Sequence, residues 1–210
     1  MNEQPLVRSA PEEIGLSSKQ VQSCIRALNH DLTTMNGLMM ARHGKVFSVC
    51  WWTPYRAELV HSNHSFGKSY TATAIGFALQ EGLLSLDECM ADVFAEAISQ
   101  RNLQLDERTH RITIRHVRTM TNGRAHHPDM AGDWIGNYFA RPMAYEPGTR
   151  FAYNSSGSCM LGAIVRKRTG LNMKEYLTPR LFDKIGIDAE RFVWCKFPNG
   201  IDGEPGTFAT

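Results

Sequence analysis

The strand-like and helical patterns of this chain fall in different parts of the sequence, and this order limits the folds that it can form. Two β-prone runs, 37–42 and 46–52, flank a turn that contains Gly44, which predicts an antiparallel hairpin. Residues 18–31 precede the hairpin and carry apolar side chains three and four positions apart, which predicts an amphipathic helix. From Ser65 onward the patterns are helical. We therefore predict an α+β fold in which a helix and a strand pair precede a block of helices.

Capping residues mark the ends of several predicted helices. Ser17 or Ser18 begins the first helix, and Gly82 and Gly170 follow two of the later ones. The later helical segments are expected at 65–81, 87–99, 114–120, 133–139 and 155–169, with a last one that opens at Asn172.

Length and composition are those of an ordinary globular domain. A chain of 210 residues buries about 70% of the surface that it exposes when unfolded. Its 42% of hydrophobic residues exclude the composition typical of disordered chains. No internal repeat or low-complexity linker divides the sequence, so we predict a single domain over 1–210 with a helical region at about 65–190.

The charge balance argues against nucleic acid or an anionic membrane as a partner. The formal net charge is +2, from 23 basic and 21 acidic residues. The densest basic stretch lies between Arg108 and Arg118, where Arg111, Arg115 and Arg118 are spaced as on one helix face. Two interpretations of this stretch stay open, a solvated helix face and a phosphate-binding patch.

The cysteines and the N-terminal residues bear on the compartment. The five cysteines are scattered and form no Cys-x-x-Cys pair, so neither a disulfide framework nor a zinc knuckle is expected. The sequence begins without an apolar run of signal-peptide length, and no window approaches the roughly 20 apolar residues of a membrane span. The chain as it stands is expected in a reducing cytoplasm.

Ser65-Phe66-Gly67-Lys68 is the one Ser-x-x-Lys in the sequence. The composition alone gives roughly 0.4 chance matches to this pattern, so the placement matters more than the pattern. A serine at a helix start lies beside free backbone N–H groups that can stabilise an oxyanion. A lysine three residues later returns to the same face, where it can accept the hydroxyl proton. The alternative is a capping serine followed by a solvated lysine.

Three segments resemble the β-lactamase-related serine hydrolases, a family that includes class C β-lactamases, esterases and D-amino-acid peptidases. Residues 64–88 resemble the family's nucleophile helix, and 112–123 resemble the helix before its active-site loop. Residues 146–155 are similar to the segment that carries its catalytic tyrosine. The resemblance runs in order from about Pro11 to Phe192 and implies a β-lactamase/transpeptidase-like fold.

The resemblance implies a role for each matching position. Ser65 would be the nucleophile, Lys68 would activate it, and Tyr153 would exchange a proton with Ser65 and the leaving group. A phenol has a reference pKa near 10, so it needs a neighbouring cation to act as a base near neutrality. The alternative for Tyr153 is a half-buried core aromatic. The implied activity is cleavage of a small-molecule ester, amide or β-lactam-like substrate, carboxylesterase-like or β-lactamase-like, with no cofactor.

The chain departs from the family's pattern at two places. The family commonly has Tyr-x-Asn, whereas this chain reads Tyr153-Asn154-Ser155, so we take Asn154 and Ser155 as candidate substrate-binding residues. Ser155 either hydrogen-bonds the substrate or caps the next helix. The second departure is that no Lys-Thr-Gly or His-x-Gly motif follows Tyr153.

The second departure affects the sheet as well as the site. In the family the two N-terminal strands pair with strands from the C-terminal part, so a chain that ends at Thr210 is expected to be C-terminally truncated. Its strand pair would keep an open edge, and an open edge favours homo-oligomers. Losing one oxyanion donor costs about 10²- to 10³-fold in rate, so a truncated or degenerate non-catalytic member of the same family is the alternative.

Other chemistry finds less support in the sequence. No Gly-x-Ser-x-Gly is present, which argues against an α/β-hydrolase. The side chains of His126, His127, Asp129 and Asp133 could bind a metal only from a loop without recognised ligand spacing. We therefore predict no metal site.

Overall fold

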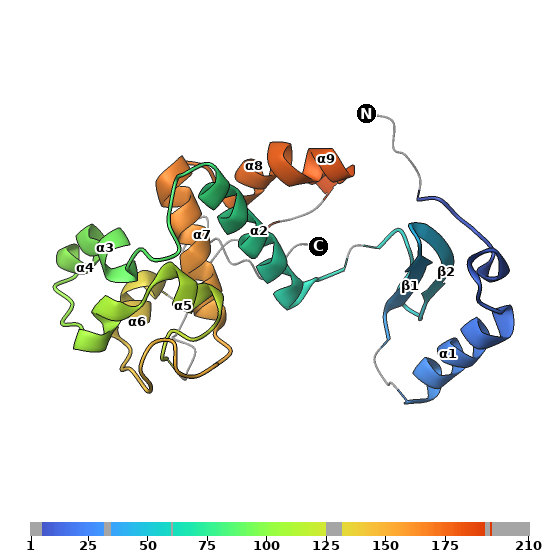
Figure 1. Ribbon diagram of the computed structural model, residues 1–210, viewed down its shortest axis with the longest axis horizontal. Helices are drawn as coiled ribbons and strands as arrows, with labels where there is room; N and C mark the ends of the chain where they lie inside the picture. The colour runs from blue at the N-terminus through green and yellow to red at the C-terminus, as the bar shows by residue number, and fades with distance from the viewer. Residues whose placement is uncertain (1–5, 32–34, 60, 125–131, 192–193, 195–210) are drawn as a thin grey trace. The chain divides into compact units, whose positions relative to one another are not determined.

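The computed structural model describes residues 6–31, 35–59, 61–124, 132–191 and 194. Within it the chain divides into two compact units, Met1–Val60 and His61–Thr210 (Figure 1). The single domain expected from the sequence stays a prediction. Among the described residues, no helix combines the length and the apolar character that crossing a bilayer requires.

The first unit contains a helix and a β-hairpin, as predicted. Its elements are η1 (Pro11–Ile14), α1 (Ser18–Asp31), β1 (Gly37–Arg42) and β2 (Lys45–Trp51). Ser17 is the residue that caps α1, because its Oγ accepts from the Gln20 backbone N–H at 3.2 Å. In return, Gln20 Oε1 accepts from the Ser17 backbone N–H at 2.9 Å, which completes a capping box.

The hairpin turns over two residues. Arg42 pairs with Lys45, and His43 and Gly44 between them have φ values of 53° and 74°. Two central residues with positive φ make a turn whose twist matches that of the strands. In the described part of the chain the sheet has these two strands, and Val46 also accepts from the Ser9 N–H and donates to the Val7 carbonyl.

The second unit is a helical block. Its elements are η2 (His64–Phe66), α2 (Gly67–Gln80), α3 (Met90–Val93), α4 (Ala95–Gln100), η3 (Glu107–Arg111), α5 (Ile114–Arg118), α6 (Trp134–Ala140), α7 (Ser155–Thr169), α8 (Met173–Leu177), the π-helical turn η4 (Thr178–Phe182), α9 (Asp183–Ile185) and η5 (Ala189–Arg191). Helices α2 and α7 pack against each other, and α5 also packs on α7. Fully buried side chains such as Ile75, Ile114 and Ile164 join the three helices in one core.

The helix ends follow local signals closely. Thr113 caps α5, Asn172 caps α8, and Gly170 ends α7 with a φ of 74°. Gly82 follows α2 with a φ of 70°, and the N–H groups of Gly82 and Leu83 donate to the last free carbonyls of the helix. The predicted segments at 65–81, 114–120 and 155–169 are therefore confirmed within a residue or two.

The predicted helix at 87–99 is wrong as a continuous element. It begins only at Met90, because the backbone N–H of Met90 donates to the Ile112 carbonyl and that of Ile114 donates to the Glu88 carbonyl. It then breaks at Phe94, whose φ of −108° and ψ of 20° leave the helical region. At the start of the predicted segment, backbone hydrogen bonds to Ile112 and Ile114 thus take the place of helical hydrogen bonds.

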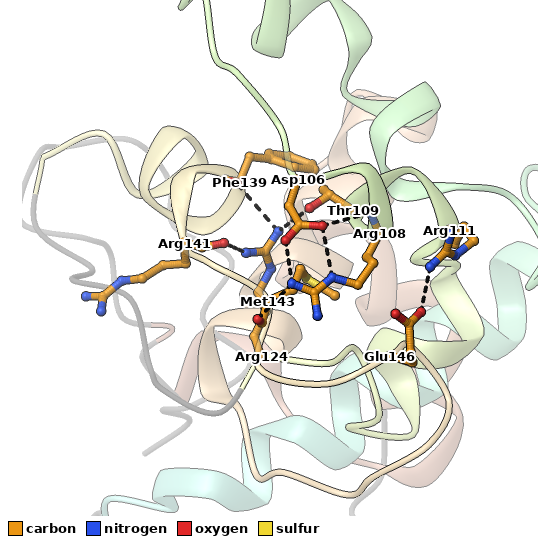
Figure 2. A network of polar contacts seen from close by, with 9 residues as sticks. All are labelled: Asp106, Arg108, Thr109, Arg111, Arg124, Phe139, Arg141, Met143 and Glu146. Atoms are coloured by element: carbon orange, nitrogen blue, oxygen red, sulfur yellow. Dashed lines mark hydrogen bonds and ion pairs between the residues drawn. The ribbon is translucent and has the colours of Figure 1, made fainter.

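The basic stretch between Arg108 and Arg118 is divided between η3 and α5, so its arginines do not share one helix face. Arg108 pairs with Asp106 at 2.6 Å and Arg111 with Glu146 at 2.6 Å (Figure 2). Arg115 pairs with Asp87 at 3.0 Å. Each of these guanidinium groups is thus matched by a carboxylate of the chain, which leaves less positive charge for a phosphate than the sequence suggests.

A buried arginine fastens three segments of the helical block. Arg124 is 1% exposed, and its guanidinium donates to the backbone carbonyls of Arg141 and Phe139 and, at 3.2 Å, to the Thr109 hydroxyl (Figure 2). Its guanidinium carbon also lies 5.0 Å from the ring centroid of Tyr138. The end of α6, η3 and the segment after α5 are therefore joined through one side chain.

We expect Arg124→Met to lower the free energy of unfolding by about 2–4 kcal/mol, because the three acceptor oxygens would stay buried without a donor. Urea denaturation followed by circular dichroism measures this loss. The matched control is Arg118→Met at an exposed position on α5, for which a change within about 0.5 kcal/mol is expected. Equal losses in the two variants would contradict the role given to Arg124.

Candidate active site

Ser65 lies at the start of the helix that the sequence predicts. The turn η2 runs directly into α2, and Phe66 and Gly67 already have helical backbone angles. His64, immediately before Ser65, has a φ of 43°. A non-glycine residue in this left-handed region costs of order 1–3 kcal/mol, and such strain is common beside functional side chains. The chain thus enters the helix through a sharp turn that leaves Ser65 exposed.

Lys68 returns to Ser65 after one helical turn. Its Nζ donates a hydrogen bond to Ser65 Oγ at 3.1 Å. Lys68 as a whole is half-buried. The spacing of three residues predicted this contact, and a catalytic role for either side chain stays a prediction.

Tyr153 reaches the same hydroxyl from a distant part of the sequence. Its phenol OH donates to Ser65 Oγ at 2.6 Å, across 88 positions of sequence. Lys68 Nζ also lies 5.1 Å from the centroid of the Tyr153 ring. With 46% of its surface exposed, Tyr153 is not a core aromatic. One serine oxygen therefore receives hydrogen bonds from an amine and a phenol.

The surroundings of Tyr153 favour its ionised form. The hydrogen bond with Ser65 is the largest influence and lowers the pKa of the phenol below its ordinary value. Partial burial opposes this, while the hydrogen bond and charge of Lys68 and the hydroxyl of Ser155 lower the pKa further. A serine hydroxyl held between an amine and a phenol with a lowered pKa has the arrangement that nucleophilic catalysis requires.

The two residues after Tyr153 differ in their surroundings. Asn154 is 2% exposed, and its Oδ1 caps α7 by accepting from the Gly157 N–H at 3.0 Å and from the Ser156 hydroxyl at 2.5 Å. The interpretation of Ser155 as the helix cap is therefore wrong, since Asn154 has this function and Ser155 is the first residue of α7. Contact of either residue with a substrate stays a prediction.

The hydrogen bonds that fix the Tyr153 segment to the loop after α5 were not anticipated from the sequence. The Ala152 N–H donates to the Met120 carbonyl at 2.8 Å, which joins the chain before Tyr153 to the loop after α5. Asn122 in this loop is 1% exposed. The only sequence signal for the loop is Asn122-Gly123, a dipeptide typical of tight turns.

The candidate metal ligands do not form a site in the described part of the chain. Asp133 caps α6 and pairs with Arg101 at 2.5 Å, while His126, His127 and Asp129 lie outside the described residues. No group of three or more potential ligands occurs among the described histidines, cysteines and carboxylates.

Two curated fungal proteins are similar to this chain. The lovastatin esterase of Penicillium rubens is 27% identical over 151 residues, which cover 60% of this chain and 37% of the esterase. Acyltransferase calJ of Penicillium decumbens is 24% identical over 159 residues, which cover 64% of this chain and 38% of the acyltransferase. The chain therefore spans less than two fifths of the length of these relatives.

The fold and the family agree with these similarities. An octameric penicillin-binding protein homologue from Pyrococcus abyssi superposes with a TM-score of 0.64 over 91% of this chain and 53% of its own, at 21% identity. The β-lactamase/transpeptidase-like fold expected from the sequence is thus confirmed. The family model named Beta-lactamase matches residues 22–192, most of the chain. The chain belongs to the Beta-lactamase family.

Proposed function

We propose that this chain is the part of a serine hydrolase that carries the nucleophile, and that it cleaves an ester or amide through an acyl-Ser65 intermediate. The observation that supports this most is the convergence on Ser65 Oγ, with Lys68 Nζ at 3.1 Å and the Tyr153 phenol oxygen at 2.6 Å. Both distances permit direct proton transfer. The family is one of serine hydrolases. What is proposed beyond this is that Ser65, Lys68 and Tyr153 are the catalytic residues and that the intermediate is an acyl-Ser65 ester.

In the acylation step, Ser65 Oγ attacks the substrate carbonyl and its proton passes to the ionised Tyr153 oxygen. The bond between the carbonyl carbon and the leaving group then breaks, and the leaving alcohol or amine takes the proton from Tyr153. Lys68 keeps a positive charge beside the phenol and so favours the phenolate that accepts the proton. Water then gives a proton to the same phenolate and attacks the acyl carbon, the bond from that carbon to Ser65 Oγ breaks, and Tyr153 returns the proton to Ser65 Oγ.

We propose a small-molecule ester as the substrate class, with carboxylesterase-like rather than β-lactamase-like activity. The similarity to a lovastatin esterase and to an acyltransferase supports this choice, because the first name describes cleavage of an ester and the second describes transfer of an acyl group. An acyltransferase would share the first half of the mechanism and differ only in the acceptor of the acyl group.

We expect a fluorophosphonate probe to label the chain once, at Ser65. Intact-mass analysis followed by peptide mapping gives the number and position of adducts. Ser65→Ala should lose the adduct, while Ser69→Ala, the same change one turn further along α2, should keep it. An adduct on Ser62, Ser69 or Ser155 would contradict the assignment of the nucleophile.

Lys68→Ala and Tyr153→Phe should each slow acylation at Ser65 by about 10²- to 10⁴-fold, because both changes interrupt one proton path. The double variant should then be within about tenfold of the slower single variant, since residues that act as a unit are not additive. Rates of labelling by p-nitrophenyl acetate or the fluorophosphonate measure this. Lys167→Ala on an exposed face of α7 controls for the loss of a positive charge. Additive losses would argue for independent roles.

The Tyr153 phenol should titrate at higher pH in Ser65→Ala than in the parent chain. The hydrogen bond with Ser65 is the largest influence that lowers its pKa, so removing the hydroxyl destabilises the phenolate and moves the titration toward the ordinary value. NMR of tyrosine labelled with ¹³C at Cζ follows the titration, and Tyr153→Phe assigns the signal. The signal should not move in Ser69→Ala. An unchanged midpoint in Ser65→Ala would show that the Ser65 contact does not hold the phenolate.

A further inference from the structure

Tyr153 lies in an extended segment that has no helix or strand of its own to fix it. The segment between α6 and α7 instead donates backbone N–H groups to the loop after α5. Ala152 donates to the Met120 carbonyl at 2.8 Å, and Gly148 donates to the Thr121 carbonyl at 2.8 Å. The position of the phenol therefore depends on where this loop presents its carbonyl groups.

The loop is bent so that its carbonyls face the Tyr153 segment. Met120 and Gly123 have φ values of 56° and 81°, both in the left-handed region. The Gly123 carbonyl accepts from Ala144 at 2.8 Å and from Tyr145 at 3.0 Å. Three carbonyls of one short turn, those of Met120, Thr121 and Gly123, thus hold the segment that leads to Tyr153.

Asn122 lies inside this turn and is 1% exposed. Its Oδ1 accepts from the Arg124 backbone N–H at 3.1 Å, and its Nδ2 donates to the Tyr138 hydroxyl at 3.4 Å. The carbonyl half of the amide fixes the turn, and the amino half joins the turn to α6. A side chain that lacks either half would loosen one of these two connections.

The same amide lies against the first turn of α7. A Cβ atom placed on Gly157 would be 3.3 Å from Asn122 Nδ2 and 3.1 Å from a methyl group of Val117. Gly157 is also the residue whose N–H is capped by Asn154, the residue after Tyr153. Asn122 therefore contacts two supports of Tyr153. One is the Met120–Gly123 turn, which accepts hydrogen bonds from the Tyr153 segment, and the other is α7, which follows Tyr153 in the sequence.

We infer that Asn122 is a positioning residue for Tyr153. Its buried amide holds the Met120–Gly123 turn against the start of α7, and these two supports set the phenol oxygen at hydrogen-bond distance from Ser65 Oγ. The inference rests on the proposed function for its catalytic meaning, although the placement of the phenol can be measured without any reaction.

Asn122→Ala and Asn122→Asp separate the two halves of the amide. Alanine removes both connections, and aspartate keeps the acceptor for Arg124 but loses the donor to Tyr138. We expect the rate of acylation at Ser65 to fall by about 10- to 100-fold in Asn122→Ala, because a misplacement of the catalytic group near 1 Å slows a reaction by about that much. The Tyr153 titration should move to higher pH as its contact with Ser65 lengthens.

Gly157→Ala tests the same contact from the opposite side. The added methyl group pushes α7 away from Asn122 and Val117, so the acylation rate and the Tyr153 titration should change in the same direction as in Asn122→Ala. The control is Tyr176→Phe, which removes a 3.0 Å hydrogen bond to Glu81 at the far end of α2. It should lower stability while leaving both readouts unchanged.

The outcomes distinguish positioning from a general structural role. The inference would be overturned if Asn122→Ala and Gly157→Ala lower the melting temperature but change neither the acylation rate at Ser65 nor the titration midpoint of Tyr153. If Asn122→Ala does not fold, Asn122→Asp and Gly157→Ala decide the question by the same two readouts. If the parent chain is not labelled at Ser65, the proposed function fails, and the titration of Tyr153 still decides whether Asn122 positions the phenol.

Discussion

The hydrogen bond between the Tyr153 phenol and Ser65 Oγ joins two parts of the chain that are 88 residues apart. It can form only if the start of α2 and the segment before α7 are held in a fixed relation. Helices α2 and α7 pack against each other, and buried side chains such as Ile75 on α2 and Ile164 on α7 belong to one core. The helix pair thus determines where the two oxygens meet.

The tyrosines of this chain illustrate how environment selects a chemical role. Burial raises the pKa of Tyr70 and Tyr138, and burial together with Glu81 raises that of Tyr176 to about 12. The pKa of Tyr153 is lowered instead, because this phenol is half exposed and lies beside Ser65 and Lys68. The surroundings of the first three phenols favour the neutral form, whereas those of Tyr153 favour the ionised form.

Local signals explain which features could be predicted. The cap of α1, predicted at Ser17 or Ser18, and the contact of Ser65 with Lys68 three residues later depend on neighbours in sequence, and both are confirmed. The late helix start at Met90 depends on pairing with distant backbone, which no local pattern encodes. The left-handed conformation of Met120 could not be predicted either, because methionine is not a residue typical of turns. Tyr153 was found through family resemblance, since spacing alone gives no reason to place it beside Ser65.

Asn154 shows how the helix that follows the site is adapted to the phenol beside it. Its Oδ1 caps α7, while its buried Nδ2 has no hydrogen-bond partner among the described residues. An unsatisfied buried donor costs about 1–3 kcal/mol, and an aspartate would supply the same cap without that donor. A carboxylate one residue from Tyr153 would, however, oppose ionisation of the phenol. On the proposed mechanism, a neutral amide caps α7 without opposing ionisation of Tyr153. The cost of this choice is a buried N–H group without a hydrogen-bond partner among the described residues.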